Sequence, residues 1–126
     1  MSSTDNTPRV ALAGPAELIE ALGPGLAAAG VEVVASCTDR ADVMATVRGR
    51  TTDVVIVDRN LDGGGLIAAA ALAARRRRPK VLVVGGDAPG ERRAARLAGA
   101  SAYLPRSSTP NDIAALVAEL AGKEHP

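Results

Sequence analysis

Short apolar segments rich in Val and Ile alternate with longer segments rich in Ala and Leu along most of the chain. The short segments are apolar at consecutive positions, which is typical of strands that are buried on both faces. The longer segments place apolar residues three or four positions apart, as amphipathic helices do. This alternation predicts five pairs of a strand and a helix, the pattern of a parallel sheet covered by helices.

The predicted strands span residues 10–13, 31–35, 54–57, 81–84 and 102–104. The predicted helices span residues 16–29, 39–48, 66–78, 89–97 and 110–121. Thr38 or Asp39 can cap the second helix and Thr109 the fifth. Pro24 lies inside the first helix, where we expect a kink or break because proline lacks a backbone donor.

Five such pairs with right-handed crossovers predict one α/β domain with a doubly wound, flavodoxin-like parallel sheet of strand order 2-1-3-4-5. The length of 126 residues suits a single domain and excludes an enzyme with separate cofactor and substrate domains. We expect the domain to span residues 9–121, between a disordered N-terminal tail at 1–8 and a C-terminal tail at 122–126.

In sheets of this kind the functional residues lie beyond the carboxyl ends of the strands. Asp58 directly follows the run DVVIV. Burying a charged carboxylate costs free energy, so we expect Asp58 to have either a functional role or a partner that compensates its charge. One interpretation is a nucleophile or ligand. The other is a carboxylate that hydrogen-bonds the following loop or pairs with Arg106.

Composition narrows the function classes. The net charge of +1 is too balanced to predict a polyanionic partner for the whole chain, although residues 1–62 carry five basic and nine acidic groups and residues 63–126 carry ten and five. Phe and Trp are absent and Tyr103 is the only aromatic residue, which argues against base stacking on nucleic acid. Cys37 stands alone and no apolar run could span a membrane, so we expect a cytoplasmic protein with no membrane partner.

Three segments resemble the receiver domains of two-component response regulators, especially those that precede LuxR-type or NarL-type DNA-binding regions. They are DVVIVD at 53–58, PKVLVVGGD at 79–87 and AGASAYLPR at 98–106. The resemblance runs from about residue 9 to residue 120 and implies the CheY-like form of the predicted fold. It also implies that Asp58 occupies the place of the aspartate that accepts a phosphoryl group.

At the other site positions the sequence departs from this family. The resemblance implies an acid pair that holds Mg²⁺ after the first strand, and Gly14 and Pro15 stand there instead. A hydroxyl residue that contacts the phosphoryl oxygens is expected at the end of the fourth strand, at the position we align with Val84. The lysine that ends the fifth strand is replaced by Arg106. Because phosphoryl transfer to a carboxylate needs charge neutralisation, we expect no cofactor and no bound metal, and specifically no Mg²⁺.

Arg106 can bind a carboxylate through two parallel hydrogen bonds, so we predict a standing pair with Asp58. The alternative is that Arg106 points into solvent. Tyr103 matches the aromatic residue that in this family swings between outward and inward positions, and an interpretation as a packing residue is favoured over a switch.

Two further motifs have competing interpretations. The backbone amides of Gly63, Gly64 and Gly65 could face an anion at the start of the third helix, but no nucleotide-binding loop is present because no Lys and Ser or Thr follow. Arg75–Arg78 could bind nucleic acid, but we interpret them as a solvated helix end, because one helical turn would spread four arginines around its axis.

The sequence therefore predicts a degenerate receiver, a regulatory protein-interaction module and not an enzyme, without Mg²⁺-dependent phosphorylation. We expect a homodimer, a histidine kinase or another regulatory protein as partner, and contact with DNA only through an output domain that this chain does not contain. One alternative is a working phosphoacceptor, with Asp58 phosphorylated by a histidine kinase and Asp62 or Asp87 as a displaced metal ligand. The other is a regulatory domain that binds a small anion through Arg106 and the glycine amides.

Overall fold

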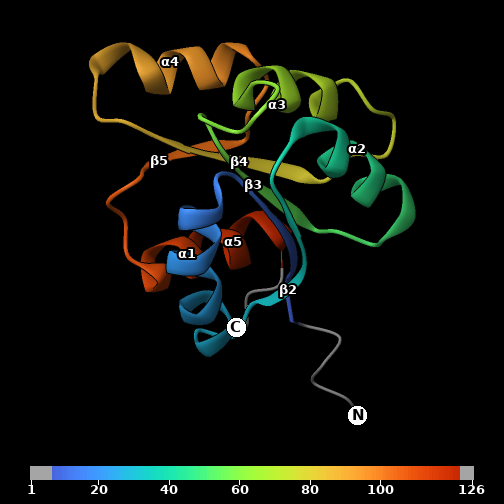
Figure 1. Cartoon of the computed structure of the whole chain (residues 1–126), viewed down its shortest axis with the longest axis vertical. Coiled ribbons are helices and arrows are strands. Elements are labelled where there is room, and N and C mark those ends of the chain that lie inside the picture. The colour runs from blue at the N-terminus through green and yellow to red at the C-terminus, as the bar shows by residue number, and fades with distance from the viewer. Residues whose placement is uncertain (1–6, 123–126) are drawn as a thin grey trace.

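Five parallel strands form one sheet in the order β2-β1-β3-β4-β5 (Figure 1). The structure is a computed structural model, and the residues it describes are 7–122. The strands are β1 (Arg9–Ala13), β2 (Glu32–Cys37), β3 (Val54–Asp58), β4 (Lys80–Gly85) and β5 (Ala102–Pro105). The predicted fold class and strand order are confirmed.

The helices follow the strands in strict alternation, as predicted. They are α1 (Ala16–Ala28), α2 (Arg40–Gly49), α3 (Gly65–Ala73), α4 (Pro89–Leu97) and α5 (Pro110–Ala121). Asp39 caps α2 by accepting a hydrogen bond from the backbone of Asp42. Thr109 and Asp112 form a reciprocal capping box at the start of α5, so both predicted cap positions are occupied by capping side chains.

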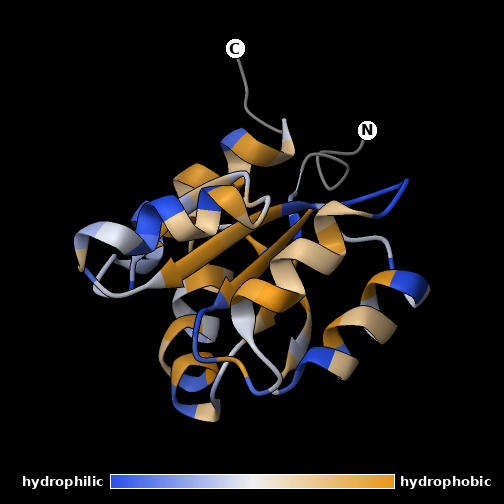
Figure 2. Ribbon diagram, turned by 90° about the horizontal axis from the view of Figure 1, so that it is seen from above, coloured by the Kyte–Doolittle hydropathy of each residue, from blue (hydrophilic) through white to orange (hydrophobic). Residues whose placement is uncertain are grey.

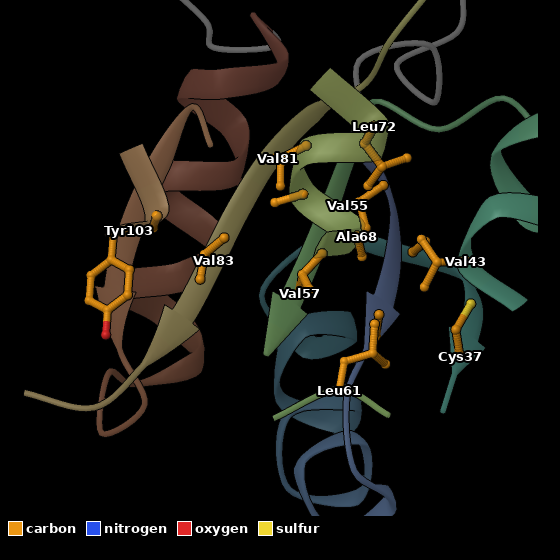
Figure 3. Close-up of a cluster of buried hydrophobic side chains, with 14 residues drawn as sticks. Cys37, Val43, Val55, Val57, Leu61, Ala68, Leu72, Val81, Val83 and Tyr103 are labelled. Atoms are coloured by element: carbon orange, nitrogen blue, oxygen red, sulfur yellow. The ribbon is translucent and has the colours of Figure 1, made fainter. Parts of the chain in front are cut away.

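The sheet separates two apolar layers (Figures 1 and 2). Helices α1 and α5 cover one face, where their Leu, Ile and Val side chains pack on alternate residues of β1, β3 and β4. Helices α2, α3 and α4 cover the other face, and Figure 3 shows this second cluster, which includes Val55, Val57, Val83 and Tyr103. Every residue of β3 is buried, which agrees with the uninterrupted apolar run in the sequence.

Two predicted helices differ from those observed. Helix α1 continues through Pro24 without a break. Helix α3 ends at Ala73, whereas the sequence predicted that it would continue to Arg78. Four consecutive arginines offer no apolar position that could pack against the sheet, and Pro79 disfavours helical backbone at Arg78. The segment 75–78 is therefore an irregular connection to β4 and not a helix end.

The ends of the chain were predicted to be tails. Residues 1–6 and 123–126 of these tails lie outside the described residues. Pro8 was assigned to the N-terminal tail but is buried, and its carbonyl accepts a hydrogen bond of 2.9 Å from the amide of Glu32. No helix between residues 7 and 122 is long and apolar enough to cross a membrane.

Candidate functional site

Asp58 and Arg106 form a bidentate ion pair at the carboxyl edge of the sheet. Asp58 is the last residue of β3 and is 1% exposed, and Arg106 directly follows β5. Arg106 Nε donates to Asp58 Oδ2 at 2.8 Å, and Arg106 Nη2 donates to Asp58 Oδ1 at 3.0 Å. The amide of Asn60 also donates to Asp58 Oδ1, at 2.7 Å. The predicted pair is present, and both carboxylate oxygens are engaged.

The pair balances charge inside the protein. The hydrogen bond to Asp58 is the main cause that raises the pKa of Arg106 above its ordinary value. The Arg106 side chain is 39% exposed, so the guanidinium covers the carboxylate from the solvent side. Two parallel hydrogen bonds fix the orientation of both groups, which one ammonium group could not do in the same way.

Gly14 and Pro15 leave little room and no side-chain oxygen beside Asp58. A Cβ atom at position 14 would lie 2.6 Å from Leu18 Cδ2 and 2.9 Å from Asp58 Cβ, so the glycine permits a close approach of β1 to the carboxylate. Pro15 precedes α1 and makes no side-chain cap. A mostly apolar hollow of about 370 Å³ adjoins the pair, lined by Pro15, Glu17, Leu18, Ala21, Leu22, Asp58, Asn60 and Arg106.

The two displaced acids that the sequence suggested do not line this hollow. Asp62 is exposed and forms an isolated β-bridge with Asp39, and Asp87 is exposed in the loop before α4. Glu17, which sequence reasoning missed, is the other carboxylate at the hollow. Within residues 7–122 no three His, Cys, Asp or Glu side chains are grouped so that they could hold a metal ion.

Val84 and Gly85 lie on opposite faces of β4. Val84 is the register partner of Asp58, and its side chain is buried in the cluster under α1 and α5. A Cβ atom at Gly85 would lie 2.6 Å from Tyr103 Oη and 2.8 Å from Glu91 Oε1. The residue of β4 that faces Tyr103 is therefore Gly85, one position beyond Val84, which we had aligned with the hydroxyl residue of the family.

Tyr103 is packed inward in this structure. It is 7% exposed and belongs to the buried cluster drawn in Figure 3. Its hydroxyl donates to the carbonyl of Gly86 at 2.5 Å and lies 3.3 Å from Glu91 Oε1. The guanidinium of Arg92 lies 5.4 Å from the centre of the ring and donates to the Tyr103 carbonyl at 3.2 Å. Burial, followed by the charge of Glu91, raises the pKa of the Tyr103 hydroxyl.

Glu91 joins the loop after β3 to the loop after β4, a role that the sequence did not suggest. Its Oε1 accepts a hydrogen bond of 2.9 Å from the amide of Gly86 and lies 3.4 Å from Arg59 Nη1. The hydrogen bond from Gly86 is the main cause that lowers the pKa of Glu91. The available signals were Arg59 directly after the strand that carries Asp58 and an acidic residue in the first turn of α4. A spacing of 32 residues hides this pairing in the sequence.

The glycine triplet does not face Arg106. The amide of Gly64 donates to the carbonyl of Leu61 at 2.9 Å, and the amide of Gly65 donates to that of Arg59 at 3.3 Å. The carbonyl of Gly63 accepts a hydrogen bond from Arg40. The amides of Gly64 and Gly65 are therefore hydrogen-bonded within their own loop, and the triplet does not line the hollow beside Asp58 that Arg106 lines.

Comparisons with known proteins agree with this fold. No protein-family model matches the chain, and no curated protein matches it in sequence. The signal receiver domain of a response regulator named NarL from Mycobacterium tuberculosis is 24% identical, with a TM-score of 0.85 over 94% of this chain and 98% of that chain. A two-component response regulator of the LuxR family from Aurantimonas sp. SI85-9A1 is 28% identical, with a TM-score of 0.75 over 92% of this chain and 86% of that chain.

A CheY-like receiver domain protein from Methanospirillum hungatei JF-1 is 21% identical, with a TM-score of 0.78 over 93% of this chain and 96% of that chain. These structures share the alternating strands and helices found here over nearly their whole length. In fold, the chain resembles the receiver domains of response regulators, including those of the NarL and LuxR type.

Proposed function

We propose that this chain is a receiver domain that regulates without Mg²⁺-dependent phosphorylation, as a protein-interaction module of a cytoplasmic signalling or transcription regulator. The observation that carries the proposal is the bidentate pair of Asp58 and Arg106. A phosphoryl donor would have to displace a guanidinium that already neutralises the carboxylate. The same guanidinium supplies, from within the chain, part of the positive charge that a metal ion would otherwise bring.

The donor set around Asp58 does not fit Mg²⁺. This ion requires a nearly octahedral arrangement of oxygen ligands, to which proteins usually contribute carboxylates. Gly14 and Pro15 offer no side-chain oxygen, and the place of a Cβ atom at position 14 is restricted by Leu18 and Asp58. Glu17 is exposed and is the single further carboxylate among the residues lining the hollow. We therefore derive no reaction through a metal ion.

The inward position of Tyr103 supports an interaction role. Helix α4, strand β5 and helix α5 enclose a hollow of about 350 Å³ next to its ring, which is lined by Arg92, Arg96, Ala100, Ser101, Ala102, Tyr103, Leu104 and Leu116. Basic side chains thus border apolar ones on a surface that the Tyr103 contacts hold in one shape. We propose that this surface binds a partner protein, with a second copy of the chain as the first candidate.

Intact-mass spectrometry tests the proposal directly. The chain is incubated with acetyl phosphate and millimolar Mg²⁺, beside an Asp58→Asn variant that lacks the acceptor. We expect no phosphorylated species in either sample. A phosphorylated species that forms on the wild-type chain and not on the variant would overturn the proposal and favour a phosphoacceptor. Light scattering after size exclusion tests the dimer separately.

A repaired site provides the positive control. The combined changes Gly14→Asp, Pro15→Asp, Gly85→Thr and Arg106→Lys would supply the acid pair, the hydroxyl and the lysine that the resemblance implies, with the hydroxyl at Gly85 because Val84 points into the apolar cluster under α1 and α5. Leu18 and Tyr103 must move to admit the new side chains at positions 14 and 85. We expect the combined variant, once circular dichroism shows that it is folded, to bind Mg²⁺ and to gain phosphate on Asp58, and each single change to do little, because the groups must act together. Equal phosphorylation of the wild-type chain and the repaired chain would contradict the proposal.

A further inference from the structure

Five arginines from two separate segments line one cavity at the amino edge of the sheet. The last turn of α2 supplies Arg48 and the connection from α2 to β3 supplies Arg50. The connection from α3 to β4 supplies Arg75, Arg77 and Arg78. Both connections run on the same side of the molecule in Figure 1. The cavity has a volume of about 550 Å³, and its other lining residues are Val47, Gly49, Thr51, Thr52 and Pro79.

The end of α3 at Ala73 brings these side chains together. A helix continued through residue 78 would have distributed the four arginines around its axis, which was the reason to interpret them as a solvated helix end. The observed irregular segment instead directs Arg75, Arg77 and Arg78 to one cavity, opposite Arg48 and Arg50. Arg48, Arg50, Arg77 and Arg78 remain exposed to solvent, as the solvated interpretation expected, and Arg75 is partly buried.

The positive charge of this cavity has no counter-charge among the described residues. None of the residues lining the cavity is acidic, and none of the five arginines forms an ion pair with a carboxylate within residues 7–122. The C-terminal ends of α2 and α3 lie nearby, but each helix end contributes only about half a negative charge. These helix ends cannot balance five guanidinium groups.

Two contacts show how the arginines are held. Arg50 Nη1 donates to the carbonyl of Val34 at 2.7 Å, which fixes this side chain and leaves its other donors available. The Nε atom of Arg75 is buried and has no hydrogen-bond partner in the described part of the chain. Because an unpaired buried donor costs free energy, an acceptor that reached Arg75 would be favourable.

We propose that this cavity binds a small molecule that carries two or more phosphate groups. Guanidinium groups bind phosphate oxygens through paired hydrogen bonds, and five of them around one cavity can engage several phosphates at once. The exposed Thr51 adds a hydroxyl donor at the rim. The cavity volume lies within the range of about 300 to 1,000 Å³ that is typical of small-molecule sites.

Nucleic acid is a less suitable occupant. Proteins that bind single strands usually stack bases on aromatic side chains, and the one aromatic residue of this chain, Tyr103, does not line the cavity. The site is also separate from the proposed receiver function, because it lies at the amino ends of β3 and β4 whereas Asp58 ends β3 at the opposite edge. Either proposal can fail without the other.

Calorimetric titration with inorganic tripolyphosphate tests the site in the intact chain at low salt. We expect saturable binding, with NMR shifts in residues 47–52 and 75–80 and none at Arg106. The variant Arg48→Gln with Arg77→Gln should bind about tenfold more weakly for each lost charged contact. The control Arg40→Gln with Arg93→Gln removes the same charge from the start of α2 and from α4, outside the cavity, and should bind as the wild type does.

Three results would overturn the proposal. The first is no binding of tripolyphosphate at millimolar concentration, and the second is equal weakening by both double variants, which would indicate a general effect of net charge. In a parallel titration with single-stranded and duplex oligonucleotides, affinity that grows with length and exceeds that for tripolyphosphate would assign the arginines to nucleic acid instead. Circular dichroism of each variant confirms that it is folded.

Discussion

Arg106 binds both carboxylate oxygens of Asp58, through hydrogen bonds of 2.8 and 3.0 Å that join the carboxyl ends of β3 and β5. The aspartate is buried and the arginine is exposed to solvent on one side, so the two residues do not depend on each other equally. Loss of the arginine leaves a charge inside the protein, whereas loss of the aspartate leaves a charge that can reach water.

This asymmetry predicts unequal effects of two substitutions. Arg106→Met should lower the free energy of unfolding by about 2 kcal/mol, less than for a fully buried pair because the arginine is partly exposed. Asp58→Asn should lower it by about 1 kcal/mol, because the amide oxygen can still accept a hydrogen bond from the amide of Asn60. Urea unfolding followed by circular dichroism measures both. Equal stability of Arg106→Met and wild type would show that the pair contributes no stability.

Two glycines of α1 provide a matched test of helix packing. A Cβ atom at Gly25 would lie 2.6 Å from Cγ of Pro110, at the start of α5, whereas a Cβ atom at Gly23 meets nothing within 4 Å. Gly25→Ala should therefore destabilise the protein by about 1 to 3 kcal/mol. Gly23→Ala should change the stability by less than about 0.5 kcal/mol, because alanine favours helical backbone whereas the following Pro24 disfavours it for a residue with a Cβ atom. Thermal unfolding of both variants measures the difference, and equal shifts would contradict the predicted contact.

The acid stability of the fold should depend on Glu91. Its pKa is lower in the folded protein than the ordinary value of 4.5, mainly because of the hydrogen bond from Gly86. The Glu91 carboxylate therefore stabilises the fold above the pKa of the unfolded chain, and this contribution is lost as the pH falls through the lower folded pKa. Glu91→Gln should flatten the loss of stability in acid, measured by urea unfolding at a series of pH values. Glu20→Gln, at an exposed position of α1, is the control and should retain the wild-type slope.

A side chain at position 85 should displace Tyr103. Gly85→Ala places a Cβ atom where Tyr103 Oη and Glu91 Oε1 now lie within 3 Å, so the ring must leave its inward position. Nuclear Overhauser contacts between the Tyr103 ring and Val83 should weaken in this variant. Gly90→Ala, where a Cβ atom meets nothing within 4 Å, should leave them unchanged. An unchanged ring position in Gly85→Ala would mean that Glu91 and the backbone move instead.

The sheet could be predicted from the sequence because its strands are continuous apolar runs. A strand that is buried on both faces admits few polar residues. The bidentate pair could also be predicted, since Asp58 and Arg106 both follow strands whose carboxyl ends meet. The end of α3 at Ala73 could not be predicted, because Ala and Arg have similarly high helix propensities. Only packing against the sheet distinguishes the alanines of α3 from the arginines that follow it.

The remaining errors arose at the scale of one residue or one loop. Val84 and Gly85 are adjacent in β4, so they point to opposite faces of the sheet. The alignment of motifs did not determine which of the two residues faces Tyr103. The sequence does not show that the amides of Gly64 and Gly65 donate hydrogen bonds to carbonyls of their own loop. Glu91 was missed because two of its partners, Arg59 in the loop after β3 and Tyr103 in β5, are distant from it in sequence.

Tyr103 sits at the junction of β4, β5 and α4, and the chain contains no Trp, no Phe and no second Tyr. All near-ultraviolet absorption and emission from aromatic side chains therefore comes from one ring, whose hydroxyl lies beside a carboxylate and a carbonyl. Proximity of a proton acceptor quenches tyrosine emission, so the optical spectrum of the unlabelled protein reports on a single contact. Any change in the contacts of Tyr103 with Gly86 and Glu91 can therefore be followed optically without a label.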